Sequence, residues 1–219
     1  MFNVTRTQPA PASLAAKKSY NGEDVVLALR SIFFDKCYLC ETKDPTSLNV
    51  EHFDAHEGDA NKKYDWNNLF FVCGRCNNIK LAKYSDLLDC TDNTCDVLSL
   101  VRHIPPHTPN QNRLTIEAMA SDQKTVNTTK LIDEIFNTEQ TINKKVTGAY
   151  LRKSVYRRYN RLLELINQFF DDESSDSIKA DALSRLQVLM SKQQEFSAFL
   201  RWVVKGDAVL NELLGKFIV

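Results

Sequence analysis

Two cysteine pairs frame the part of the sequence in which chemistry is most readily expected. Cys37 and Cys40 form one C-x2-C unit, and Cys73 and Cys76 form another. Two intervening residues allow both thiolates of a unit to reach one tetrahedral ion at about 2.3 Å, the length of a zinc–sulfur bond. The N-terminus lacks the features of a signal peptide, so reduced thiols and metal binding are expected rather than disulfides. The four cysteines are therefore predicted to hold a structural zinc ion.

Acidic, imidazole and amide side chains lie between and directly after these pairs. Glu51 and His52 are adjacent, and Asn77 and Lys80 follow the last cysteine. Phosphodiester hydrolysis requires an activated water, a cation on the phosphate oxygens and help for the leaving oxygen. The reference pKa of histidine, about 6.5, suits His52 as a general base. The oxygens of Glu51 and Asn77 suit Mg²⁺, and Lys80, on the same helical face as Asn77, could neutralise phosphate charge.

The strand that carries Glu51 and His52 sets a geometric condition on such a site. Adjacent residues of a regular strand point to opposite faces, so both side chains serve one site only if the strand ends or bulges there. The polar segment that follows predicts that it ends. Asn68 is expected to tie the loop to the site by hydrogen bonds rather than to bind metal. His56 could contact phosphate or assist metal binding, or it could be a loop histidine without a role.

These residue types and spacings, over about residues 37–84, resemble the HNH endonuclease superfamily. In that family an acidic residue precedes the catalytic histidine on a strand, and a metal ligand follows the last cysteine. The resemblance implies an α+β, mainly helical fold around a zinc-knuckle ββα-metal, treble-clef-like core, with structural Zn²⁺ and catalytic Mg²⁺ or Mn²⁺. It implies catalytic roles for Glu51, His52, Asn68, Asn77 and Lys80. Asn77 replaces the histidine of many members, and its amide oxygen still suits Mg²⁺.

A narrower similarity rests on "VEHF", on the "DWNNL" and "CNNIK" runs, and on "FSAFLRWVV" near the C-terminus. These segments are similar to the PtuB nucleases of Septu and retron-associated anti-phage defence systems. The similarity implies a DNA-cutting effector and a PtuA-like ATPase partner of the ABC/SMC type. Phe196, Phe199 and Trp202 would then anchor the partner, or they would fill the core of the chain itself. A zinc-knuckle binding module without catalysis and a ribonuclease on the same scaffold remain alternatives.

Composition limits how the chain could contact nucleic acid. The sequence has 219 residues, is 43% hydrophobic and 26% charged, and has a formal net charge of zero. A nucleic-acid contact must therefore come from a local patch, such as the basic segment 144–161. Its helical spacing predicts a ridge that tracks phosphates, although a solvated face or a surface for an acidic partner would look the same. The expected nucleic-acid contacts are Lys80, Lys83, Lys153, Arg157 and Arg161.

The order of patterns along the chain predicts four parts. They are a flexible tail at residues 1–20, a nuclease domain at 21–90, a β-hairpin insertion at 91–125 and a helical domain at 126–219 that docks a partner or binds nucleic acid. Strands are expected at residues 46–53, 68–73, 96–104 and 113–120, and helices at 22–36, 77–88, 126–137 and about 141–170. Cys90 and Cys95 are expected to be free thiols. Since no apolar run approaches the length of a membrane span, the cytoplasm is the expected location.

Overall fold

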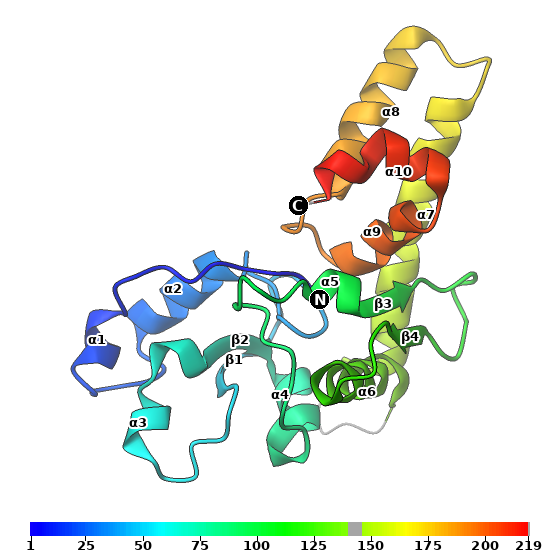
Figure 1. Ribbon diagram of the computed structural model, residues 1–219. Helices are drawn as coiled ribbons and strands as arrows, with labels where there is room; N and C mark the ends of the chain where they lie inside the picture. The colour runs from blue at the N-terminus through cyan, green and yellow to red at the C-terminus, as the bar shows by residue number, and fades with distance from the viewer. Residues whose placement is uncertain (140–145, 219) are drawn as a thin grey trace.

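The computed structural model describes residues 1–139 and 146–218 and shows a mainly helical α+β chain (Figure 1). Its described part contains two antiparallel strand pairs, β1 (Leu48–His52) with β2 (Leu69–Cys73) and β3 (Val101–Ile104) with β4 (Thr115–Ala118). The helices of the N-terminal half are α1 (Ala12–Ala15), α2 (Glu23–Ile32), α3 (Ala60–Lys63), α4 (Gly74–Lys80) and α5 (Val97–Leu100). Those of the C-terminal half are α6 (Gln123–Asn137), α7 (Gly148–Phe170), α8 (Asp176–Leu189), α9 (Ser197–Lys205) and α10 (Ala208–Leu214).

The hairpin β1–β2 leads directly into α4. Every residue of β2 is buried, as expected for the uninterrupted apolar run "LFFVC". In the register of the hairpin, Glu51 lies opposite Phe70 and His52 opposite Leu69. Cys73 is both the last residue of β2 and the N-cap of α4, where its sulfur accepts a hydrogen bond from the amide of Cys76 at 3.5 Å. The strands expected on both sides of the site are thus confirmed, and strand, knuckle and helix form one continuous unit.

Two predicted elements have different limits in the structure. The strand expected at residues 96–104 begins as helix α5, because the side chain of Asp96 caps the amide of Ser99 at 3.2 Å. The α-helix expected at 77–88 ends at Lys80, since Leu81 has a positive φ of 38° and only a 3-10 turn follows. The expected start of the long helix near residue 141 lies outside the described residues, and α7 is described from Gly148.

The N-terminal segment is packed into the core, so the prediction of a flexible tail at residues 1–20 is wrong. Its Ala- and Pro-rich middle suggested a tail, but the apolar residues on either side of it are covered by the rest of the chain. The buried side chains are Met1, Phe2, Val4 and Leu14. The amide of Val4 also donates to the carbonyl oxygen of Cys90 at 2.9 Å. Burial of this apolar surface holds the segment in place.

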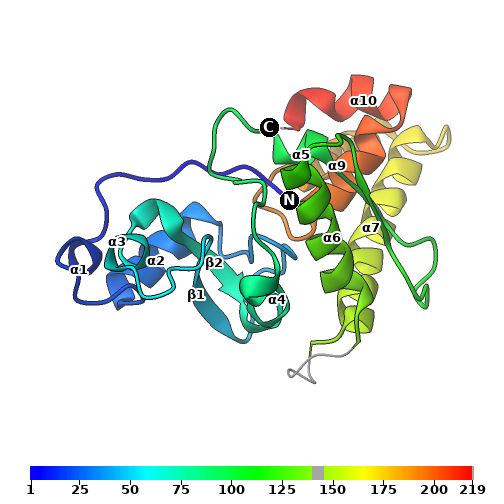
Figure 2. The ribbon, with the colours of Figure 1, turned by 60° about the horizontal axis from the view of Figure 1, so that its bottom comes forward.

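The described residues form two hydrophobic cores, and the predicted boundary between residues 125 and 126 crosses the first. That core extends from the N-terminus and the cysteine pairs to α6 and the first turns of α7, including Phe136 and Leu151. The second core lies between the rest of α7 and helices α8, α9 and α10. Helix α6 lies between α4 and α7 in both views (Figures 1 and 2). The helical half is therefore not a separate unit, since removing α6 would expose the core of the metal-binding half.

Two of the three aromatic residues expected as partner anchors belong to the interior of the chain. Phe196 and Phe199 are 0% and 1% exposed and lie in the first core. Trp202 is half-buried, and its indole N–H lies 2.9 Å from each of the carbonyl oxygens of Leu98 and Val101. Phe196 and Phe199 thus fill the chain's own core, one of the two roles considered, whereas Trp202 stays partly exposed. None of the helices in the described part of the chain is both long and apolar enough to cross a membrane.

Arg75, a buried residue between the cysteines of the second pair, holds the helical half in place. The guanidinium of Arg75 donates to the carbonyl oxygens of Ile135 at 2.8 Å and Thr138 at 2.7 Å, at the C-terminal end of α6, and to that of Val146 at 3.1 Å. Carbonyls at a helix C-terminus lack partners within the helix, and a cation there is favourable. Arg75 therefore fastens the second cysteine pair to α6 and to the approach to α7.

We expect Arg75→Lys to lower the free energy of unfolding by about 3 kcal/mol, because an ammonium cannot present a planar fork to three carbonyl oxygens. Urea unfolding of the zinc-loaded protein, followed by circular dichroism, measures the change. The matched control is Arg185→Lys, which alters an exposed pair with Asp181 (2.9 Å) and is expected to change stability by less than about 0.5 kcal/mol. Equal stability of the two variants would contradict the role of Arg75.

Candidate metal centre and catalytic pocket

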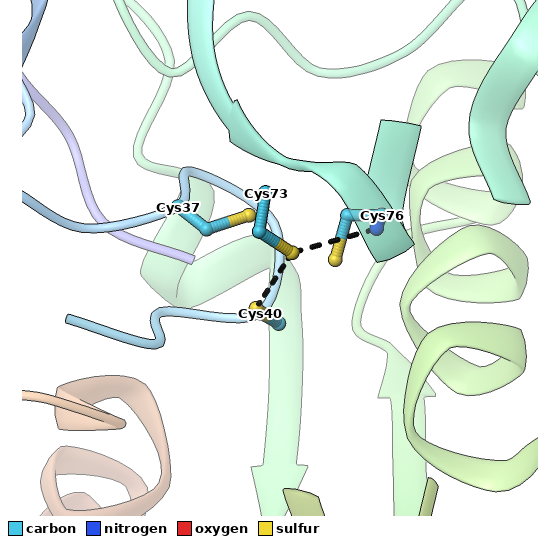
Figure 3. Close-up of side chains that lie close together, drawn as sticks. All are labelled: Cys37, Cys40, Cys73 and Cys76. Atoms are coloured by element: carbon cyan, nitrogen blue, oxygen red, sulfur yellow. Dashed lines mark hydrogen bonds between the residues drawn. The ribbon is translucent and has the colours of Figure 1, made fainter. Parts of the chain in front are cut away.

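Four cysteines meet at the junction of β2 and α4 (Figure 3). Cys37 and Cys40 lie in the turn that follows α2, whereas Cys73 ends β2 and Cys76 lies in the first turn of α4. Their sulfur atoms all lie within 4.8 Å of one another, and all four residues are buried. Among the described residues, no other group of three or more His, Cys, Asp or Glu side chains is placed so that it could hold a metal ion. The predicted cysteine cluster is thereby confirmed.

The donor set and its burial fit a structural zinc ion. Burial raises the pKa of the Cys37 and Cys76 thiols, and a bound cation would offset this and hold these two sulfurs as thiolates. Four thiolate donors within 4.8 Å of one another favour zinc, and a four-cysteine zinc site leaves no open position for substrate. Cys90 and Cys95 are free thiols outside this cluster, as expected, and burial raises the pKa of both. The cluster can therefore hold a zinc ion that organises the fold.

A second site lies beside the cysteine cluster, in an open cavity of about 700 Å³ between β1, the loop that follows it and the end of α4. The residues assigned from the sequence that line it are Glu51, His52, Asn77 and Lys80, together with His56. β1 ends at His52, as the polar segment after it predicted, although Glu51 and His52 both still pair with β2 and both line the cavity. The chain fold thus brings strand and helix residues to one cavity.

His52 is half-buried, and its ring is held on three sides. Its Nε2 lies 3.0 Å from the carbonyl oxygen of Lys63, and its ring centroid is 4.8 Å from that of Tyr20 and 4.6 Å from that of His56. A carbonyl oxygen only accepts hydrogen bonds, so Nε2 carries the proton and Nδ1 of the neutral ring keeps a lone pair. Burial lowers the pKa of His52, which favours this neutral form. The arrangement presents a base at Nδ1.

Glu51 and Lys80 form a buried pair in the cavity wall. The Glu51 carboxylate accepts a hydrogen bond from the Tyr38 hydroxyl and lies 3.3 Å from the Lys80 ammonium. Lys80 also donates to the carbonyl oxygens of Phe53 at 2.9 Å and His52 at 3.3 Å. Burial raises the pKa of Glu51 although Lys80 acts against this. The Lys80 ammonium is thus bound by groups of the protein itself, and a contact between Lys80 and phosphate stays a prediction.

Asn68 joins the two ends of the loop between β1 and β2. Its side-chain oxygen accepts from the Asp54 amide at 2.7 Å, and its amide nitrogen donates to the carbonyl oxygens of Asp54 at 2.9 Å and Lys62 at 3.1 Å. The structure therefore shows the loop-tying hydrogen bonds that the sequence predicted. Asn77, on α4, is half-buried and lines the cavity without contributing to this loop.

Two aromatic residues of the site were not identified from the sequence. Tyr38 lies between the first two cysteines, and its position inside a knuckle is a signal that it would be held near the metal centre. Tyr20 lies in the segment predicted to be a tail, and no local pattern indicates its contact with His52. It reaches the cavity because the N-terminal segment packs on the domain.

The expected nucleic-acid contacts on α7 do not line the cavity. Lys153 and Arg157 are exposed on α7, which packs against α6, α8 and α9. Arg157 donates to the Ser154 hydroxyl at 2.9 Å, and Arg161 pairs with Glu164 at 3.0 Å. Residues 144 and 145 of the basic segment lie outside the described part of the chain. A ridge directly beside this cavity is therefore not observed among the described residues, and binding of phosphates by α7 stays a prediction.

Lys83 follows α4 in the 3-10 turn Leu81–Lys83 and was also expected to contact nucleic acid. Its exposed ammonium lies 2.6 Å from a carboxylate oxygen of Glu134 on α6. An exposed pair of this kind is worth little, so nucleic acid could replace Glu134 as the partner of Lys83. Its contact with a phosphate stays a prediction.

We expect purified protein to contain about one tightly bound zinc ion per chain, and Cys37→Ser or Cys73→Ser to lose most of it together with several kcal/mol of folding free energy. Metal analysis by mass spectrometry and thermal unfolding with and without a chelator provide the measurements. Cys95→Ser is the matched control, since Cys95 is a thiol outside the cluster. Well-folded protein that carries no zinc would refute the metal centre.

Comparison with known proteins identifies the segment that carries both sites. Residues 37–83 match the family model of the HNH endonucleases. No curated protein matches the chain. The matched residues include both cysteine pairs, the hairpin β1–β2 and helix α4, and with them all the catalytic residues assigned from the sequence. The match supports membership of this segment in the HNH superfamily, and with it hydrolytic activity of the nuclease type.

Proposed function

We propose that the protein is a metal-dependent endonuclease that hydrolyses phosphodiester bonds of DNA. One observation carries the proposal: within the segment that matches HNH endonucleases, β1 and α4 bring Glu51, His52 and Asn77 to the wall of one open cavity. A module that only binds nucleic acid or protein would need the zinc-organised fold but not this combination of a base and two oxygen donors. The combination therefore favours an enzyme over a binding module.

His52 is the general base of the proposed reaction. Its Nδ1 takes a proton from the attacking water, while Nε2–H stays hydrogen-bonded to the carbonyl oxygen of Lys63. This carbonyl holds the ring in the required tautomer and stabilises the imidazolium that forms when the proton arrives. The contact with Tyr20 limits rotation of the ring away from the cavity.

Glu51 and Asn77 would hold the catalytic Mg²⁺ or Mn²⁺. Both offer oxygen donors and both line the cavity, which fits a hard divalent cation. When bound, such a cation stabilises charge on the phosphate oxygens. The hydrogen bond from Tyr38 orients the Glu51 carboxylate, and the Lys80 ammonium lies 3.3 Å from it. A bound cation would compete with this ammonium for the carboxylate, so metal binding would require the Lys80 contact to lengthen.

His52→Ala is expected to reduce the cleavage rate by about 10²–10⁴-fold, because alanine cannot accept the proton. Zinc content and thermal stability should stay near those of the wild type, since His52 does not contact the cysteine cluster. Cleavage is measured on plasmid DNA in Mg²⁺ or Mn²⁺, with His107→Ala, an exposed histidine away from the cavity, as the control. Undiminished cutting by folded His52→Ala protein would show that His52 is not the base.

Asn77→Ala is expected to respond differently to metal. If Asn77 is a ligand, its loss weakens binding of the catalytic cation, and a higher Mn²⁺ concentration should restore part of the activity. Raised Mn²⁺ should not restore His52→Ala, since no ligand is missing there. A titration of cleavage rate against Mn²⁺ for both variants makes the distinction. The same response from both variants would argue against separate roles.

A ribonuclease remains the second candidate activity, because the chemistry at phosphate is the same for either sugar. Parallel incubation of the wild type with plasmid DNA and with total RNA distinguishes the two. We further propose a cytoplasmic nuclease effector that works with an ABC/SMC-type ATPase of the PtuA kind in anti-phage defence. Support for this comes from the segments around Glu51 and Phe199 that are similar to PtuB nucleases. Co-purification of the full chain with such an ATPase tests it, and failure to associate would count against it.

A further inference from the structure

His56 is a second histidine in the cavity, and none of the roles above uses it. It lies in the loop that follows β1 and is half-buried. Its ring meets the ring of His52 edge-on, with centroids 4.6 Å apart and an interplanar angle of 69°. A substrate phosphate within reach of His52 would therefore also lie near His56.

The loop holds the His56 ring in one tautomer. The backbone amide of Gly58 donates a hydrogen bond to Nδ1 of His56 at 3.1 Å. An amide N–H can only donate, so Nδ1 keeps its lone pair and the proton of the neutral ring is on Nε2. Gly58 reaches this position with φ of 92°, a conformation that glycine adopts readily. Asp59 continues the tight loop, with its amide bonded to the His56 carbonyl at 2.7 Å.

The two histidines that line the cavity thus differ in hydrogen-bonding role: one offers a lone pair and the other an N–H. His52 is bonded at Nε2 and keeps a lone pair at Nδ1, whereas His56 is bonded at Nδ1 and keeps a proton at Nε2. Neither assignment depends on the titration of either ring, since each follows from the direction of a backbone hydrogen bond. One ring can accept a proton, and the other can donate a hydrogen bond.

We propose that His56 is a neutral hydrogen-bond donor to a non-bridging phosphate oxygen of the substrate, an inference that rests on the proposed nuclease function. Negative charge on these oxygens increases as water attacks, so a fixed N–H donor stabilises the transition state more than the ground state. His56 is not a general acid, because loss of the Nε2 proton while Nδ1 is unprotonated would leave an imidazolate. With its proton in place, Nε2 is also not a metal ligand.

Two substitutions separate this role from simple packing against His52. His56→Phe keeps a flat ring beside His52 but has no N–H, whereas His56→Gln loses the ring and offers an amide N–H. We expect His56→Phe to lower kcat for cleavage by about 10–100-fold with little change in KM, somewhat below the loss of a fully buried oxyanion donor. We expect His56→Gln to stay within about threefold of the wild type. Zinc content of each variant confirms that it is folded.

The reverse order, with His56→Phe active and His56→Gln impaired, would overturn the proposal in favour of ring packing, and full activity of both would overturn it as well. If the wild type cleaves neither DNA nor RNA, it is the proposed nuclease function that fails. Nuclear magnetic resonance of full-length, zinc-loaded protein with ¹⁵N-labelled histidine tests the tautomer without any activity. The expected result is a proton on Nε2 of His56 at neutral pH, assigned by comparison with His56→Gln, and a proton on Nδ1 would overturn the proposal.

Discussion

Convergence of four buried cysteine sulfurs is the constraint on which the rest of the structure depends. Cys73 ends β2 and caps α4, so a metal ion held by the cluster sets the direction in which α4 leaves the hairpin. That direction places Asn77 and Lys80 opposite Glu51. A closed zinc site contributes folding free energy without taking part in the reaction, which leaves the adjacent cavity free for chemistry.

The same two cysteine segments connect the hairpin to the helical half. Arg75 reaches the end of α6, and the buried Lys36–Glu41 pair, at 3.2 Å, is joined to α9 because Glu41 also accepts from the Ser197 hydroxyl at 2.8 Å. A buried ion pair stabilises the fold only while all its partners are present, because removing one of them leaves a buried charge without compensation. The matched segment 37–83 is therefore embedded in the remaining chain rather than appended to it.

Charge in the cavity is arranged mostly by internal contacts. The Lys80 ammonium is surrounded by the Glu51 carboxylate and two backbone carbonyl oxygens, and the tautomers of His52 and His56 are set by backbone groups of the loop. Prearranged donors and acceptors of this kind need little reorganisation when substrate binds, which is the condition for electrostatic stabilisation of a transition state. The loop that Asn68 ties together is thus part of the catalytic apparatus in the proposed mechanism.

Local spacing was enough to predict the cysteine cluster and the strand end at His52, because a C-x2-C turn and a polar stop are each set by neighbouring residues. The loop-tying role of Asn68 was predicted from its place in the HNH pattern, since the loop it closes spans residues 53–67. The sequence alone also predicted the β3–β4 hairpin and helix α6. Burial of Met1 and Phe2, the contact of Tyr20 with His52 and the use of Lys80 inside the wall were decided only by the tertiary structure. Each depends on which distant segment covers a side chain, and the free energy of burying apolar or charged groups carries no signature in local periodicity.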